Sequence, residues 1–271
     1  MLKMRSSADD PDSANAQEQQ REGGYAVWSP SITPGIGREL SDEQKLAVVF
    51  RWLAIEGFAE NLAGHITWQR PGNETMLVNP WGLWWRELAA SDICEVDVDA
   101  NVVAGKWDVT PAIHIHTELH RARPDARVVI HNHPYYVSVM AALGVLPDLV
   151  HQTASMFSDD LGLVSEYTGE IDSAERGEEF ATSIGDANVV ILASHGVLVV
   201  GETLEQATYR AASIDRVCRM SLDIQHCGGN PLPLNPNVVA GMKSSLLERG
   251  ADIYFDGLAR QLIRNEPDVL H

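Results

Sequence analysis

The sequence predicts an α/β fold whose helices are layered on a largely antiparallel sheet. Apolar runs of strand length interleave along the chain with segments whose apolar residues recur at helical spacing. Several neighbouring strands are separated by short turns typical of hairpins, as in residues 93–103. The 271 residues contain no internal repeat and no second composition regime, so a single large domain is expected.

The N-terminal end differs from the rest of the chain. Residues 1–24 are rich in Ser, Asp, Gln, Glu and Arg and poor in large apolar side chains. Such a segment buries too little apolar surface to offset the entropy lost on ordering. We therefore predict an N-terminal arm over residues 1–37, partly disordered, and a folded domain over residues 38–271 with a helical tail at its C-terminal end.

Capping residues mark where two of the helices begin. Ser41 is followed by Gln44, and Thr203 by Gln206, the spacing of a capping box. Glycines and X-Pro pairs mark helix ends. The helices predicted in this way cover residues 42–56, 110–122, 135–143, 175–184, 204–224 and 238–263, the last with a break near residue 250.

Strands are predicted where short apolar or β-branched runs are bounded by turn residues. These runs fall in residues 61–68, 76–78, 93–103, 127–133, 189–193 and 197–200. Residues 145–170 contain short apolar pieces among many turn formers, and no strand is assigned to them.

The strand at residues 127–133 carries the main functional signal. Alternate side chains of a strand lie on one face, so His131 and His133 point the same way and can chelate one divalent ion. Pro134 fixes the path of the chain directly after them. A third histidine, His195, ends another apolar run and precedes Gly196, which permits a sharp turn. Together they predict an open three-histidine metal site.

Two alternatives remain open for these residues. Neutral histidines often serve as hydrogen-bonded structural residues that bind no metal. His116 and His120 lie four residues apart on a predicted helix and could hold a metal ion by themselves.

Composition argues against several classes of protein. The net charge of −18 repels nucleic acid and anionic membranes, so neither is an expected partner. Three cysteines without CxxC spacing argue against a disulfide framework or a thiolate zinc site. No apolar run reaches the roughly 18 residues of a membrane span, and the N-terminus lacks the apolar core of a signal peptide. A cytoplasmic location is therefore expected.

Several motifs, in order and spacing, resemble the class II aldolase/adducin family. The match runs from about residue 41 to about residue 221, and its anchors are residues 64–67, 78–82, 116–125, 131–134 and 193–198. The resemblance implies a three-layer αβα fold, makes residues 38–271 the catalytic domain, and implies a homotetramer with active sites between subunits. It places the metal ligands of the family at His131, His133 and His195.

The chain departs from the sugar-phosphate aldolases of that family at two places. Those enzymes have Ser-Gly-Asn where this chain has Ala-Gly-His at residues 63–65. They also carry a Ser-Ser pair before an acidic residue, where this chain has Thr110, Pro111 and Ala112. Pro and Ala side chains offer a phosphate no hydrogen bond, so a phosphorylated sugar is not the expected substrate.

A three-histidine metal with open positions acts as a Lewis acid, and a reaction that mainly needs an electron sink survives the loss of the carboxylate. We therefore expect a divalent-metal-dependent carbon–carbon lyase, a decarboxylase of a hydroxylated aromatic or pyridine carboxylic acid that works through a metal-bound enolate. The chain is similar in this respect to the hydroxy-pyridine and dihydroxyphthalate decarboxylases of the family. The expected cofactor is a divalent ion, Mn or Zn, with Fe possible.

Three other functions stay open. The first is an aldolase or epimerase acting on an unphosphorylated hydroxy-acid or sugar, in which another acid such as Glu118 replaces Ala112. The second is a non-heme iron oxygenase, because three neutral ligands also suit Fe(II). The third is an adducin-like interaction module without activity, which normally lacks the three histidines.

His65 and His114 are the candidates for the acid that returns a proton to carbon. His114 and His116 lie two residues apart on a predicted helix, so they cannot face the same spot. The tryptophans of residues 81–85 could wall a flat ring, or they could pack in a core or an interface.

Overall fold

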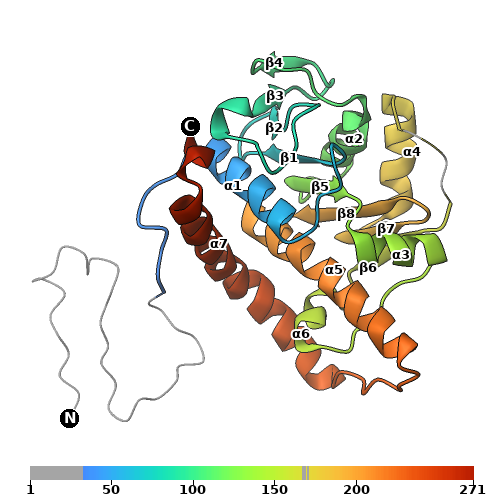
Figure 1. The fold of residues 1–271 in the computed structure, drawn as a ribbon. Helices are drawn as coiled ribbons and strands as arrows, with labels where there is room; N and C mark the ends of the chain where they lie inside the picture. The colour runs from blue at the N-terminus through green and yellow to red at the C-terminus, as the bar shows by residue number, and fades with distance from the viewer. Residues whose placement is uncertain (1–32, 167–168, 170) are drawn as a thin grey trace, which may run out of the picture.

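A computed structural model shows an α/β fold in which one sheet lies between two layers of helices (Figure 1). It describes residues 33–166, 169 and 171–271. Of the predicted N-terminal arm, only residues 33–37 fall inside these ranges. The three-layer αβα arrangement expected from the sequence is confirmed.

The described strands form one eight-stranded sheet in the order β4-β3-β2-β1-β5-β8-β7-β6. Neighbouring strands are antiparallel except β6 and β7, which run parallel, so the predicted largely antiparallel sheet is confirmed. The strands are β1 (His65–Gln69), β2 (Met76–Val78), β3 (Cys94–Val96), β4 (Val102–Ala104), β5 (Val128–Asn132), β6 (Leu161–Val164), β7 (Val189–Leu192) and β8 (Gly196–Gly201).

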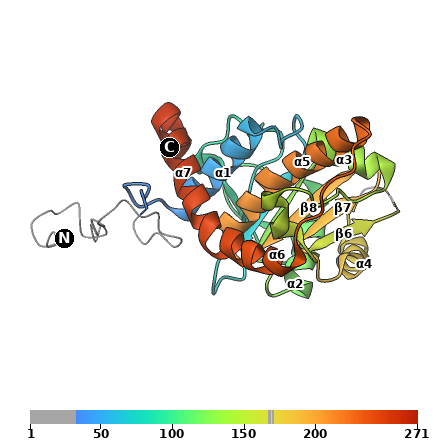
Figure 2. The ribbon, with the colours of Figure 1, turned by 90° about the horizontal axis from the view of Figure 1, so that it is seen from below.

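The helices cover both faces of this sheet, with α2 and α4 on one side and α1, α3, α5 and α7 on the other (Figure 2). The helices are α1 (Asp42–Ile55), α2 (His114–Ala122), α3 (Tyr135–Leu143), α4 (Ala174–Ile184), α5 (Leu204–His226), α6 (Pro236–Ser244) and α7 (Ala251–Asn265).

Alternation along the central strand β5 divides its side chains between two cores. Val128 and Ile130 pack in the core under α1, α3, α5 and α7. Val129 packs in the core under α2 and α4. By the same period of two, His131 lies on the α2 side of the sheet. Each of these residues is at most 4% exposed, so β5 places His131 in the buried layer between the sheet and α2.

Three details differ from the sequence prediction. Strand β6 was not predicted, because Leu161–Val164 is short, contains a glycine and gains its partner β7 only through the intervening helix α4. The break expected near residue 250 is a π-helical segment, Ser245–Gly250, that joins α6 to α7. Thr203 caps α5 by accepting from the Gln206 backbone N–H at 3.2 Å, which is only the hydroxyl half of the predicted capping box.

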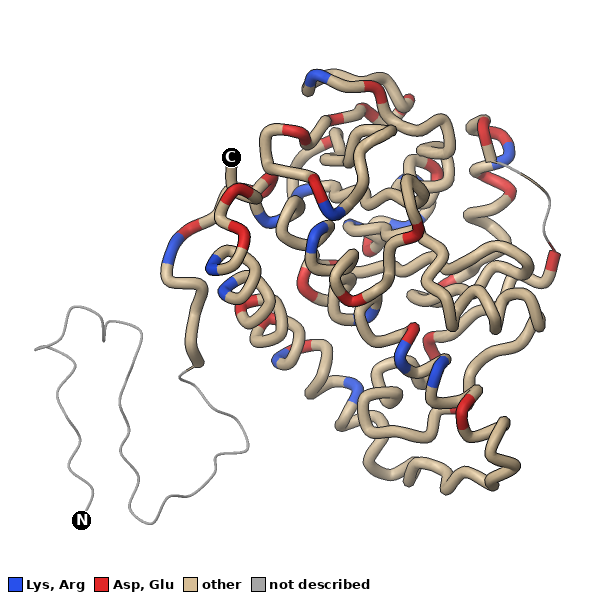
Figure 3. Tube along the Cα trace, in the orientation of Figure 1, with Lys and Arg blue, Asp and Glu red and all other residues tan. Residues whose placement is uncertain are grey.

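Acidic and basic residues are both spread over the described trace (Figure 3). Within that part of the chain, no helix is both long enough and apolar enough to cross a membrane.

Candidate metal centre

The end of β5 places two histidines on one side of the sheet. His131 is the fourth residue of β5 and pairs with His65 of β1 and Leu198 of β8. His133 follows the strand directly, and Pro134 then caps α3. Asn132, between the two, is fully buried, and its Oδ1 accepts from the His133 backbone N–H at 2.7 Å. This bond holds His133 in place after the strand has ended.

The third histidine comes from the turn between β7 and β8. His195 follows Ser194, whose φ of +56° lies in the left-handed region, so the chain reverses sharply here. Gly196 allows this turn to approach β5. A Cβ on Gly196 would lie 2.5 Å from the Asn132 carbonyl oxygen and 2.5 Å from Cδ2 of His133.

The three predicted ligands converge. One nitrogen from each of His131, His133 and His195 lies within 4.8 Å of the other two. The ring centroids are 4.8 to 5.1 Å apart. This is the only such group of histidine, cysteine and acidic side chains within residues 33–166, 169 and 171–271.

Hydrogen bonds fix which nitrogens face the centre. His131 Nδ1 donates to the Val197 carbonyl oxygen at 3.0 Å, and His133 Nδ1 donates to Oε2 of Glu60 at 2.7 Å. Both acceptors require hydrogen on Nδ1, so in the neutral rings both Nε2 atoms carry lone pairs. These two atoms are only 3.3 Å apart. Two lone pairs at that distance repel each other unless a cation lies between them.

Burial favours the neutral form of two of the three rings, His131 and His195. It lowers the pKa of His131 well below its usual value and that of His195 to about 4, and the neighbouring histidines lower both further. Neutral imidazoles are what a divalent ion of the Zn, Mn or Fe type binds. The donor set therefore fits the expected metal, and the His133–Glu60 pair has the form of a carboxylate that orients a ligand.

His65, one of the two candidates for the acid, lies beside the trio. Its ring meets that of His131 edge-on at 5.4 Å, and its Nε2 donates to the Ala112 carbonyl oxygen at 3.2 Å. Burial, with His133 and His195, lowers its pKa to about 3. The ring that stacks on His65 is that of His116 and not that of His114, and the His65 and His116 ring centroids are 4.2 Å apart. His114 begins α2, and among the described residues it has no ring contact with the trio or His65.

The pattern of residues 44–222 identifies the family of the chain. The sequence model named Class II Aldolase and Adducin N-terminal domain matches residues 44–222. The chain belongs to this family. It is 33% identical over 215 residues to the 3,4-dihydroxyphthalate decarboxylase of Arthrobacter keyseri, a match covering 75% of this chain and 84% of that protein.

Two further relatives of this class II aldolase/adducin chain add detail. It is 34% identical over 193 residues to the 4-hydroxy-3-prenylphenylpyruvate oxygenase/4-hydroxy-3-prenylbenzoate synthase of Streptomyces roseochromogenus subsp. oscitans, with 69% of each chain covered. The crystal structure of an aldolase II superfamily protein from Pseudomonas syringae matches with a TM-score of 0.74 and 25% identity, covering 84% of this chain and 94% of that one. The family relatives point to a lyase.

The alternative metal site at His116 and His120 is not available, because the two nitrogens that face each other are bonded to a threonine hydroxyl. Both rings bond the same hydroxyl, with Thr67 Oγ1 2.8 Å from His116 Nδ1 and 2.7 Å from His120 Nε2. Glu118 does not fill the place of Ala112 either, because it forms a two-oxygen ion pair with Arg121.

Glu60, Asn132 and His116 were not predicted as site residues. Glu60 lies in the loop after α1, where Asn132 Oδ1 accepts from its backbone N–H at 3.1 Å. The family motif contains Asn132 and His116, but nothing in the local sequence marks their contacts. Only the folded sheet brings these segments together.

The tryptophans of residues 81–85 divide between two environments. Trp85 is buried, stacks with Phe58 and donates to the Gly64 carbonyl oxygen at 3.2 Å, so it is a core residue. Trp81 and Trp84 are 65% and 49% exposed.

A cavity of about 300 Å³ lies beside His195, between α4 and the ends of β6 and β7. Its lining includes the apolar side chains of Ile171, Phe180 and Leu192. Arg176 is the basic residue that lines it, and Glu166 and Glu179 are the acidic ones. The cavity therefore combines apolar surface with one guanidinium group and two carboxylates beside His195.

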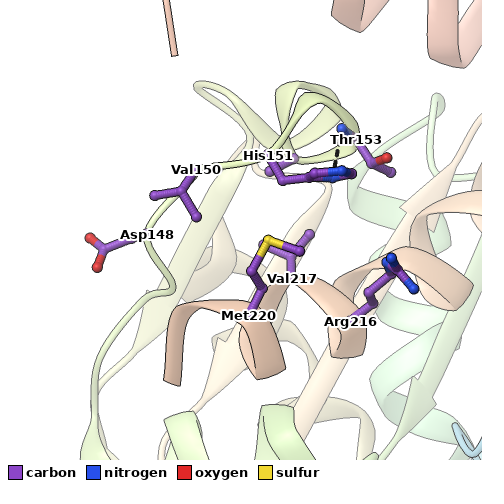
Figure 4. A pocket seen from close by; sticks show the side chains of 8 residues that line it. Asp148, Val150, His151, Thr153, Arg216, Val217 and Met220 are labelled. Carbon is purple, nitrogen blue, oxygen red and sulfur yellow. Dashed lines mark hydrogen bonds between the residues drawn. The ribbon is translucent and has the colours of Figure 1, made fainter. Parts of the chain in front are cut away.

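A second, smaller hollow lies apart from the trio (Figure 4). Residues before and within the 3₁₀ segment Gln152–Phe157 form one side and α5 forms the other, with the side chains of Asp148, Val150, His151, Thr153, Arg216, Val217 and Met220 labelled. Nδ1 of His151 accepts from the Thr153 backbone N–H at 3.3 Å, so this ring caps the segment. None of the predicted site residues lines it.

Proposed function

We propose that this chain is a divalent-metal-dependent lyase that decarboxylates a hydroxylated aromatic or pyridine carboxylic acid. The observation that carries the proposal is the convergence of three imidazoles near Ala112, a position whose side chain offers no carboxylate. In this proposal His131, His133 and His195 hold the ion. A divalent ion bound there supplies a Lewis acid for the negative charge that develops on the substrate.

The surroundings of Ala112 favour decarboxylation over aldol chemistry. Its carbonyl oxygen accepts from His65, and Glu118 is held by Arg121. Glu60 is bonded to His133 through the ring edge opposite the centre. Neither Glu118 nor Glu60 is therefore placed as the base that aldol cleavage needs, whereas loss of CO2 needs an electron sink and a proton.

The cavity beside His195 supports an aromatic acid as substrate. Phe180 and its apolar neighbours offer a surface for a flat ring, and Arg176 offers a planar partner for a carboxylate. A phosphate dianion would find one guanidinium and two carboxylates, Glu166 and Glu179, on the same wall. With two carboxylates and one guanidinium on this wall, repulsion acts on any anion and is stronger for a phosphate dianion than for a single carboxylate.

An imidazole beside the trio must return a proton to carbon. His65 remains the predicted candidate nearest the centre, and His116 joins it through their stacked rings. The role of His114 as the acid stays a prediction, and no ring contact of the described residues joins it to the centre. The choice among Mn, Zn and Fe, the homotetramer and the cytoplasmic location likewise remain predictions.

A second candidate function rests on one comparison. A relative at 34% identity is named an oxygenase, and three neutral ligands also suit Fe(II). An oxygenase consumes O2 and a decarboxylase does not, so the two functions are separable by experiment.

The test begins with elemental analysis of the purified protein. It continues with CO2 release from a panel of ortho-hydroxy aromatic and pyridine acids, with Mn(II), Zn(II) or Fe(II) added, in air and without O2. We expect about one divalent ion per chain and O2-independent CO2 release that His131→Gln abolishes. CO2 release that requires Fe(II) and O2 would favour the oxygenase, and a protein that binds no divalent ion would exclude both functions.

A further inference from the structure

Thr67, His116 and His120 form a buried chain of hydrogen bonds behind the metal centre. Thr67 lies on β1 and the two histidines lie on α2. Thr67 and His116 are 0% exposed and His120 is 6% exposed. Oγ1 of Thr67 is 2.8 Å from His116 Nδ1 and 2.7 Å from His120 Nε2. One hydroxyl therefore connects two buried imidazoles.

The hydroxyl has one hydrogen, so it donates to one ring and accepts from the other. When it donates to His120, His116 carries its hydrogen on Nδ1 and leaves a lone pair on Nε2. The opposite arrangement puts the hydrogen of His116 on Nε2. When His116 gains a proton at Nε2, its Nδ1 hydrogen can pass to Thr67 and the hydroxyl hydrogen of Thr67 can pass to His120 Nε2, so the positive charge moves to His120.

His116 Nε2 has no hydrogen-bond partner among the described residues, although it is fully buried. A buried polar atom without a hydrogen bond is unfavourable unless a ligand or a water molecule bonds to it. The His116 ring stacks on His65, whose ring in turn meets the metal ligand His131. The unpaired nitrogen thus belongs to the group of rings that surrounds the centre.

His116 also stands one helical turn after Ala112, whose carbonyl oxygen accepts from His65. Residues four apart on a helix are neighbours on one face. The contact between His65 and Ala112 therefore lies on the same face of this helical segment as His116.

We propose that His116 is the base of the reaction: its Nε2 takes the proton of a substrate hydroxyl, and Thr67 relays the resulting charge to His120. This inference rests on the proposed decarboxylase function and gives the proton-handling role to His116, with His65 as the ring that orients it. The substrate class it implies is an aromatic or pyridine acid with a hydroxyl next to the carboxylate.

The proton balance closes over one turnover. The hydroxyl O–H bond breaks and a bond from Nε2 of His116 to that hydrogen forms. The Nδ1 hydrogen of His116 passes to Thr67, whose own hydrogen passes to His120 Nε2. After the carbon–carboxylate bond breaks and CO2 leaves, the hydrogens return along the same path, and His116 gives its proton to carbon. The product oxygen takes one proton from water on release, so each turnover consumes one proton.

The test uses 4-nitrocatechol as a probe, because ionisation of its hydroxyls changes its visible absorption. It is titrated with the Zn(II)-loaded full-length protein between pH 5 and 8. We expect the wild-type protein to bind the probe in its ionised form at a lower pH than His116→Gln does. We expect Thr67→Val to weaken ionisation by about tenfold and Thr67→Ser to restore it. Thr208→Val, a fully buried threonine on α5, is the matched control and should behave like wild type.

Catalysis provides a second readout. His116→Gln should lower kcat for CO2 release by about 100-fold, with zinc content and KM close to wild type. Equal ionisation of the probe by wild type and His116→Gln would show that the metal alone ionises the hydroxyl, and would overturn the inference. Loss of ionisation in Thr67→Val and Thr67→Ser alike would also overturn it. If wild type ionises the probe but decarboxylates no acid of the panel, the proposed function fails and the assignment of the base stands.

Discussion

His131 and His133 hold their Nε2 atoms 3.3 Å apart, and each ring is tied at Nδ1 to an acceptor. Neither ring can turn its lone pair away without losing that bond. Protonation of His131 would relieve the repulsion, but burial opposes that charge and holds the pKa of His131 well below its usual value. A divalent ion would relieve it without a proton, which supports the proposed metal site.

Metal removal should destabilise the protein. An ion that binds only the folded state adds about 2.7 kcal/mol to the free energy of unfolding when it is present at 100 times its Kd. We expect a chelator to lower Tm and added Zn(II) to restore it. His195→Ala should reduce the bound metal below one ion per chain, whereas His226→Gln, at an exposed position on α5, should retain it. An unchanged metal content in His195→Ala would contradict the assignment.

Glu60→Gln should weaken metal binding by roughly 10- to 100-fold, since partners that orient a ligand contribute on that scale. The amide can still accept from His133 Nδ1, but it loses the negative charge that makes the ring a better ligand. Competition with a fluorescent zinc chelator measures the change. Glu56→Gln, an exposed carboxylate four residues earlier, is the matched control. Equal zinc affinity in the two variants would exclude this role for Glu60.

Gly196→Ala should damage the centre through packing. The new Cβ would meet the Asn132 carbonyl oxygen and the His133 ring at 2.5 Å each, and the first of these is backbone that cannot move aside easily. We expect loss of metal binding together with a lower Tm. Gly241→Ala on α6, where a Cβ meets nothing within 4 Å, should be neutral or stabilise by about 0.5–1 kcal/mol. Normal zinc affinity in Gly196→Ala would show that the turn tolerates the shift.

Arg176→Gln should raise KM for the acid substrate about tenfold with little change in kcat, because a charge-assisted bond to a carboxylate away from the reacting carbon stabilises ground state and transition state alike. Steady-state kinetics of CO2 release measure both constants. Arg219, which lies over the Tyr136 ring and pairs with Asp223, supplies the control variant Arg219→Gln. A similar rise in KM for both variants would argue for a general charge effect.

The metal ligands could be predicted from the sequence because their geometry is local. The period of two along β5 fixes the common face of His131 and His133, and the apolar run before His195 marks it as the end of a strand. The same reasoning gave most helices, since caps such as Ser41 act within one turn.

What the sequence could not supply depends on distant contacts. Glu60 and His133 are 73 positions apart, and Thr67 and His116 are 49 apart, so no local pattern connects them. The strand β6 is similar, because its hydrogen-bond partner β7 begins 25 residues after its own last residue, on the far side of α4. His114 and His116 were equally good candidates by type, and only the angle of α2 over β1 placed His116 on His65.

Acid should destabilise the metal-free protein through the buried histidines of α2. Burial lowers the pKa of His120 to about 4 and that of His116 well below its usual value, whereas both titrate near 6.5 when unfolded. Between these values the unfolded state binds more protons than the folded state. The free energy of unfolding therefore falls as pH drops from about 6.5 towards 4, by up to about 1.4 kcal/mol per pH unit for each histidine. Urea unfolding at pH 7, 6 and 5 measures the slope. His120→Gln removes one of these groups, so its slope should be shallower by one proton, and a slope equal to wild type would mean that His120 is already charged in the folded protein.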